Sequence, residues 1–129
     1  VHNRLVQLGR LPDGGTIANS ALTTPAAEPF KYAYCSDTAY SEKIVKYIEK
    51  IDCLYHEATY TNEYSIRAKQ TLHSTATEAA TIAKLAGVKK LIIGHYSARI
   101  NDVNTLLEEA KQIFPNTELG VEKKIYRLK

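Results

Sequence analysis

A capped helix followed by an unbroken apolar run limits the possible folds of this chain most sharply. Thr75 and Glu78 stand at the spacing of a capping box, in which a hydroxyl and a carboxylate satisfy each other's backbone donors. Alanines at helical spacing follow, and Gly87 supplies a helix stop. The next apolar run, LIIG at 91–94, is typical of a strand that is covered on both faces. Together these features favour a layered α/β sheet.

The same alternation of strand and helix extends over residues 31–129. Residue spacing predicts strands over 31–35, 51–55 and 91–94, and then two short closing strands over 118–121 and 124–127. Besides the capped helix, it predicts helices over 41–50, 62–71 and 103–114, the first with Ser41 as its N-cap. Residues 1–30 hold three of the four prolines and are predicted to be a loop-rich connecting segment.

Composition and charge exclude some classes of protein without choosing a function. The net charge of +3 permits a polyanionic partner but does not require one. No run approaches about 18 apolar residues, so we expect no membrane-spanning helix. Residues 1–8 lack the features of a secretory signal peptide. Cys35 and Cys53 have no CxxC partner, which favours reduced thiols in a cytoplasmic protein, with a disulfide as the alternative.

Ionisable side chains follow each of the three main predicted strands. Asp37 comes after the first strand, His56 and Glu57 after the second, and His95 after the third. Sites in open α/β sheets form beyond the carboxyl ends of the strands, so we expect these side chains to converge. Aspartate and histidine together suit a metal such as zinc. His73 precedes the capped helix, whose N-terminus favours an anion such as phosphate.

Each of these residues also has a structural interpretation that spacing alone leaves open. Asp37 is also compatible with a turn or an N-cap, and His95 with a buried, hydrogen-bonded core position. Glu57 is compatible with a surface carboxylate, and His73 with a solvated loop. Spacing alone therefore predicts an α/β domain that carries a site, without naming its chemistry.

Four short blocks of sequence narrow the interpretation: YCSDT at 34–38, HEATY at 56–60, HSTA at 73–76 and GHYSAR at 94–99. In this order they resemble the late motifs of ribonuclease Z, the tRNA 3′-processing endonuclease of the metallo-β-lactamase superfamily. The resemblance implies an αββα sandwich, of which residues 31–129 supply roughly the C-terminal half. It implies a hydrolase with two zinc ions that cleaves precursor tRNA after the discriminator base and leaves a 3′-hydroxyl.

The resemblance also implies a role for individual residues. Asp37 matches the aspartate that bridges the two zinc ions, and His95 matches the last metal-binding histidine. Glu57 and His73 match a pair that assists protonation of the leaving group. Arg99, in the last block, is the candidate for a phosphate contact. His56 has no metal role in the family, and we interpret it as structural.

The HxHxDH motif of the family, which supplies most zinc ligands and the general base, does not occur in this chain. The arm that grips tRNA is not found either. Because the chain also begins at Val1, we expect it to be a part of a longer enzyme, inactive when isolated. We expect a cytoplasmic homodimer acting on precursor tRNA. The alternatives are another metallo-β-lactamase-fold hydrolase of small esters or phosphodiesters, and a non-catalytic domain without its metal site.

Overall fold

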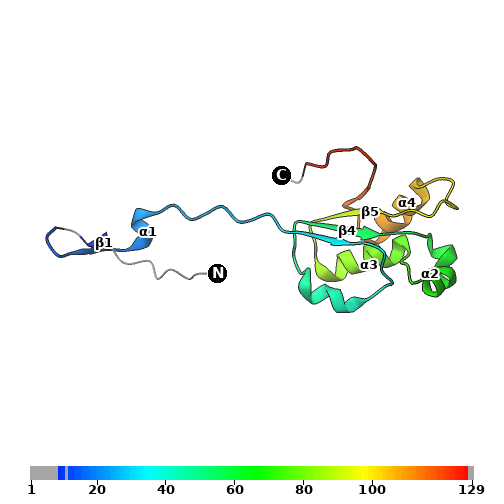
Figure 1. Cartoon of the computed structure of the whole chain (residues 1–129), viewed down its shortest axis with the longest axis horizontal. Helices are drawn as coiled ribbons and strands as arrows, with labels where there is room; N and C mark the ends of the chain where they lie inside the picture. Colours follow the sequence, from blue (N-terminus) through cyan, green and yellow to red (C-terminus); the bar gives the residue numbers. More distant parts are fainter. Residues whose placement is uncertain (1–8, 11, 128–129) are drawn as a thin grey trace.

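Four parallel strands organise the fold (Figure 1), which is known from a computed structural model that describes residues 9, 10 and 12–127. The strands lie in the order of the sequence, each one hydrogen-bonded to the next. They are β3 (Tyr32–Cys35), β4 (Cys53–Glu57), β5 (Lys90–Gly94) and β6 (Thr117–Leu119). A parallel pair needs a crossover connection, so helical segments alternate with the strands.

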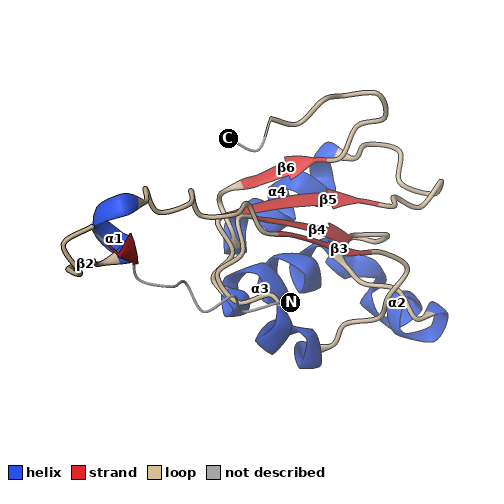
Figure 2. Cartoon of the chain, turned by 60° about the vertical axis from the view of Figure 1, so that its left-hand side comes forward, coloured by secondary structure: helices blue, strands red, loops and turns tan. Residues whose placement is uncertain are grey.

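The crossover helices cover one face of this sheet (Figure 2). A six-residue 3₁₀ helix, η1 (Glu42–Tyr47), follows β3. Between β4 and β5 come η2 (Asn62–Tyr64), α2 (Ser65–Thr71) and α3 (Ala76–Ala86). The last crossover is α4 (Asn104–Ile113). The chain therefore forms one layer of helices on one layer of sheet, and the predicted α/β class is confirmed.

The hydrophobic core lies between α3, α4 and the covered face of the sheet. Leu54, Leu91 and Ile93 point from the strands into this layer and are completely buried. The residues of α3 that face the sheet are mostly alanines, and Leu106 of α4 completes the cluster. Small side chains let the helix lie close to the strands, so the backbone of α3 is held firmly against the site end of the sheet.

The capping box of α3 forms as predicted. The Thr75 hydroxyl accepts a hydrogen bond from the Glu78 backbone N–H at 3.1 Å, and the Thr75 N–H donates to the Glu78 carboxylate at 2.9 Å. Gly87 ends the helix at φ 61°, a conformation that suits glycine. This cap fixes where α3 begins, and so fixes the position of the residues directly before it.

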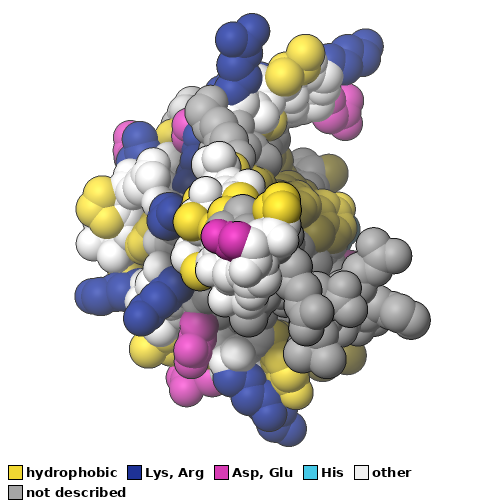
Figure 3. Space-filling model, turned by 90° about the vertical axis from the view of Figure 1, so that its left-hand side faces the viewer, with side chains coloured by type: hydrophobic (Ala, Val, Ile, Leu, Met, Phe, Trp, Pro, Cys, Tyr) yellow, Lys and Arg dark blue, Asp and Glu magenta, His cyan; other side chains and the backbone are white. Residues whose placement is uncertain are grey.

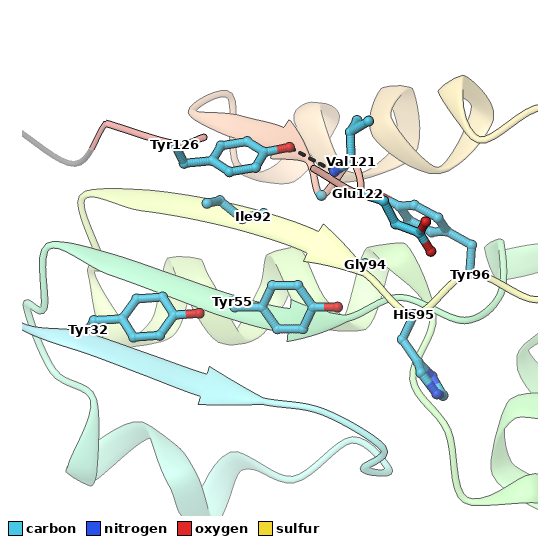
Figure 4. Close-up of a pocket in the computed structure, with 10 residues that line it drawn as sticks. Tyr32, Tyr55, Ile92, Gly94, His95, Tyr96, Val121, Glu122 and Tyr126 are labelled. Carbon is cyan, nitrogen blue, oxygen red and sulfur yellow. Dashed lines mark hydrogen bonds between the residues drawn. The ribbon is translucent and has the colours of Figure 1, made fainter. Parts of the chain in front are cut away.

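The other face of the sheet carries a row of tyrosines (Figure 4). Tyr34 and Tyr55 are paired in register and stack with ring centroids 4.5 Å apart. Tyr32 and Tyr34 remain 51% and 63% exposed, whereas Ile92 on β5 is buried. The segment after β6 passes over this face, and Tyr126 donates a hydrogen bond to the Leu119 carbonyl. A pocket of about 710 Å³ lies between this segment and the tyrosine-bearing face of the sheet.

Residues 12–30 stand apart from the sheet (Figure 1). They include β2 (Thr16–Ile17), which pairs antiparallel with β1 (Gly9–Arg10), and the short helix α1 (Asn19–Leu22). Residues 1–8, which were considered as a signal peptide, lie outside the described residues. Viewed from the end of the molecule where residues 12–30 project, basic side chains are spread out, with acidic ones between them (Figure 3).

Three sequence predictions of local structure are wrong. The helix expected over 41–50 is only the 3₁₀ helix η1, and Ser41 makes no side-chain cap. The second strand begins at Cys53 and includes His56 and Glu57, which we had expected after its end. Residues 124–127 form no strand. In the part of the chain that the structure describes, no helix combines the length and apolar character that crossing a membrane needs.

His56 makes the stability of this fold depend on pH. Its side chain is completely buried, its Nδ1 lies 2.8 Å from the Glu57 carbonyl, and its Nε2 has no partner among the described residues. Burial lowers the pKa of His56. Below the ordinary histidine pKa of about 6.5, His56 therefore binds a proton in the unfolded chain but not in the folded chain.

We predict that the free energy of unfolding falls as the pH is lowered from about 6.5 toward the depressed folded-state pKa, by at most about 1.4 kcal/mol per pH unit for this one proton. Urea unfolding of the wild-type chain and of His56→Leu at pH 8, 6.5 and 5.5 measures it. The free energy of unfolding of the wild type minus that of His56→Leu should fall as the pH falls, whichever protein is the more stable at pH 8. A difference independent of pH would show that His56 is not the group responsible.

Candidate functional site

Asp37, Glu57, His73 and His95 meet at one end of the sheet. Each offers one nitrogen or oxygen atom, and these atoms all lie within 4.8 Å of one another. Asp37 follows β3, Glu57 is the last residue of β4, His95 follows β5, and His73 lies between α2 and α3. The expected convergence at the carboxyl ends of the strands is confirmed, because parallel strands in register end at the same edge.

Two of these residues have a left-handed backbone, which non-glycine residues seldom adopt. The φ angle is 56° at Asp37 and 61° at His95. Leu72, with φ 59°, ends α2 in the same conformation directly before His73. Such positions cost roughly 1 kcal/mol or more each and are concentrated at functional sites. They turn the chain sharply after each element, so that the side chains of the site point toward one another.

Glu57 is the centre of the cluster, and its side chain is completely buried. Its Oε1 accepts hydrogen bonds from the Thr38 backbone N–H at 2.7 Å and from His73 Nδ1 at 2.9 Å. Its Oε2 accepts from the Thr59 hydroxyl at 2.5 Å and from the Ser74 N–H at 3.1 Å. Burial alone would raise the pKa of Glu57, but these hydrogen bonds outweigh it and lower the pKa.

The number of donors decides what Glu57 can do. A carboxylate has about four lone-pair positions, and four donors occupy them here. Glu57 could approach a metal ion only by giving up one of these bonds. The cluster atoms left for a metal ion are therefore those of Asp37, His73 and His95.

His73 and Glu57 form the hydrogen-bonded pair that we expected. His73 Nδ1 also lies 3.5 Å from the Asp37 carboxylate, so two acidic groups face this nitrogen. The Nδ1 position therefore carries the proton, because a carboxylate can only accept. The His73 side chain is 20% exposed, and its ring centroid lies 5.3 Å from that of His95. The Tyr60 ring packs against it in a T-shaped arrangement.

Asp37 and His95 form the open side of the cluster. The Asp37 side chain is 75% exposed, and His95 is also exposed at the rim of the tyrosine face (Figure 4). Carboxylate oxygen and imidazole nitrogen are ligands that zinc accepts, so the residues present fit such an ion. The buried Glu57 behind them supplies negative charge, which further favours a cation at this place.

Arg99 lies outside the cluster. It is exposed, and it lines a separate pocket of about 440 Å³ together with Tyr64 and Glu109. Its charge affects the site only indirectly, through Tyr60, whose ring packs on His73. The pKa of Tyr60 is lowered mainly by the Arg67 guanidinium and to a smaller degree by Arg99. The phosphate contact expected of Arg99 stays a prediction.

Thr59 is the residue of the site that sequence reasoning missed. Its hydroxyl reaches Glu57 and His95, and it lies 3.4 Å from His73. One sequence pattern pointed to it: side chains two residues apart in an extended segment lie on the same side, and Thr59 stands two residues after Glu57. His56, one residue before Glu57, lies on the opposite face and in the core, as its structural interpretation requires.

The relatives found by comparison are consistent with the motifs. No protein-family model matches the sequence. Proteins named ribonuclease Z match it closely: 55% identity over 111 residues in Parabacteroides distasonis, covering 86% of this chain and 36% of that protein. In Porphyromonas gingivalis the identity is 57% over 106 residues, covering 82% of this chain and 35% of the relative. The chain thus spans about a third of the length of these curated relatives.

Solved structures give the same fold. The metallo-β-lactamase fold protein YhfI from Bacillus subtilis is similar with a TM-score of 0.62 and 25% identity, over 67% of this chain and 35% of that one. The short form of human tRNase Z is similar with a TM-score of 0.55 and 28% identity, over 74% of this chain and 31% of that one. The resemblance to ribonuclease Z is therefore confirmed by sequence, and the chain has the metallo-β-lactamase fold over the part that it spans.

Proposed function

We propose that this chain is part of a zinc-dependent endoribonuclease that removes the 3′ trailer from precursor tRNA and leaves a 3′-hydroxyl. The observation that supports this proposal most directly is the cluster of Asp37, His73 and His95 around the buried Glu57. The sequence identity to proteins named ribonuclease Z supports the substrate class. Fold similarity does not choose a substrate, because YhfI is described only by its fold. We further propose that residues 31–129 form the C-terminal half of the catalytic domain.

Asp37 and His95 are the proposed zinc ligands of this chain, and Asp37 would be a ligand shared by both ions in the complete enzyme. Their exposure on the open side of the cluster supports this role. Bound zinc supplies Lewis-acid stabilisation of the phosphoryl oxygens during hydrolysis. Zinc takes about four ligands, so this chain alone supplies too few for two ions.

His73 is the proposed proton donor to the leaving 3′-oxygen, and Glu57 orients it. The hydrogen bond from Nδ1 to Glu57 leaves Nε2 as the nitrogen available to a substrate. Because all four lone-pair positions of Glu57 are occupied, Glu57 orients the ring rather than taking a proton from the substrate. Arg99 is the proposed contact to a tRNA phosphate, since it is exposed and not paired in a salt bridge within the described residues.

The proposed setting is a cytoplasmic homodimer. Cys35 and Cys53 are both free thiols, which supports a reducing compartment. The exposed tyrosines of β3 leave an aromatic surface that a second sheet or a second copy would cover. In this arrangement, precursor tRNA is the partner.

In the complete enzyme, His73→Ala should lower the rate of precursor-tRNA cleavage by roughly 10²–10⁴-fold, because a general acid is lost. Zinc content should stay at the wild-type level. Single-turnover cleavage and elemental analysis of the same samples measure the two quantities. Asp37→Ala is the matched comparison, because it should lose zinc as well as activity. Parallel loss of zinc and rate in His73→Ala would make His73 a ligand instead.

The isolated 129-residue chain should bind zinc weakly and should not cleave precursor tRNA, because most ligands of the two ions come from elsewhere. Light scattering should find it associated through its open sheet face. Metal analysis and a cleavage assay on material of verified mass complete the test. A monomer with two zinc ions and full activity would contradict the proposal.

A further inference from the structure

The hydroxyl of Thr59 touches three of the four residues of the cluster, although it is not one of the groups assigned to metal or substrate. Thr59 is 5% exposed. Its Oγ1 lies 2.5 Å from Glu57 Oε2, 3.0 Å from His95 Nδ1 and 2.9 Å from the His95 carbonyl oxygen. It thus lies between the end of β4 and the residue that follows β5.

Counting protons determines the direction of each contact. A hydroxyl has one proton to donate and two positions that accept. Each oxygen of the Glu57 carboxylate already accepts a hydrogen bond from a backbone N–H, so the carboxylate acts as an acceptor here, and its contact with the Thr59 hydroxyl is the shortest. The hydroxyl proton of Thr59 therefore points to Glu57. The His95 carbonyl oxygen can also only accept, and it competes with Glu57 for this one proton. Whichever oxygen takes the proton, none is left for His95 Nδ1, so the contact with that nitrogen is favourable only if the nitrogen carries a proton and donates it.

We infer that Thr59 is a positioning residue that holds His95 in the tautomer with the proton on Nδ1. The lone pair of Nε2 is then free, and an imidazole in this form can bind a metal ion through that nitrogen. The chain of donors runs from His95 through the Thr59 hydroxyl to Glu57. The metal part of this inference rests on the proposed function, whereas the tautomer part does not.

The same carboxylate therefore orders both histidines. His73 Nδ1 donates directly to Glu57 Oε1, and His95 Nδ1 donates to Oε2 through the hydroxyl of Thr59. Both rings consequently present Nε2 as the unprotonated nitrogen when they are neutral. Glu57 Oε2 also accepts from the Ser74 N–H, so the backbone and the Thr59 hydroxyl together fill its two positions.

The chain contains a matched control in the same loop. Thr61 is also buried, at 8% exposure, but its hydroxyl has no partner among the described residues. Replacing either threonine by valine removes a hydroxyl and keeps the shape of the side chain. Any general effect of the substitution on this loop appears in Thr61→Val, and an effect of the hydrogen bonds appears only in Thr59→Val.

The first test uses the metal-free chain labelled with ¹⁵N-histidine at pH 8, where the ring ¹⁵N shifts report the tautomer. His95 should have its proton on Nδ1 in the wild type, in Thr59→Ser and in Thr61→Val, and should shift toward the other tautomer in Thr59→Val. A wild-type His95 with the proton on Nε2 overturns the inference, and so does a Thr59→Val spectrum that matches the wild type. If Thr59→Val does not fold, the wild-type tautomer decides.

The second test is titration of the same four proteins with Zn²⁺ alone. Loss of an outer partner of a ligand should weaken zinc binding by about 10–100-fold in Thr59→Val, with near wild-type binding in Thr59→Ser and Thr61→Val. Equal zinc affinity in Thr59→Val and Thr61→Val would overturn the metal part. If the tautomers behave as stated but the wild type binds zinc no more tightly than Asp37→Ala does, the proposed zinc site fails and the tautomer part stands.

Discussion

The structure of the site depends on one buried carboxylate. An isolated ionised carboxylate in a protein interior costs many kcal/mol, unless hydrogen bonds replace the water that it has lost. Glu57 obtains four such bonds, and the donors come from different segments: the loop after β3, the loop after β4, and His73 and Ser74 between α2 and α3. Because every donor binds one of the two carboxylate oxygens of Glu57, these hydrogen bonds hold the segments close to one another.

The sheet and the capped helix bring these donors within reach. Parallel strands in register end at a common edge, which places the ends of β3, β4 and β5 side by side. The capping box starts α3 at a defined residue, so the Ser74 N–H points at Glu57 rather than into the helix. The left-handed backbone at Asp37 and His95 then turns both side chains back over the carboxylate.

Sequence reasoning succeeded where the determining interactions are local. The cap of α3 and the apolar run of β5 depend on neighbouring residues, and both were predicted. The prediction of a helix over 41–50 was wrong, since β-branched Ile44 and Val45 favour a helix only weakly and the segment forms just six residues of 3₁₀ helix.

The site was predictable only in outline. The convergence of Asp37, Glu57 and His95 followed from the strand order, because each stands near a strand end. The role of Thr59 was not predictable in the same way, since its hydroxyl bonds to His95, 36 residues away. The left-handed φ angles likewise depend on contacts that no short sequence window contains.

The network around Glu57 has a consequence for the order of assembly. All of its donors belong to the polypeptide, so the two histidines are oriented as soon as the strands and α3 come together. The folded chain is then ready for an ion without further rearrangement of these groups. An ion at the proposed site would therefore enter after these groups are in place, and one that is lost could be replaced without unfolding.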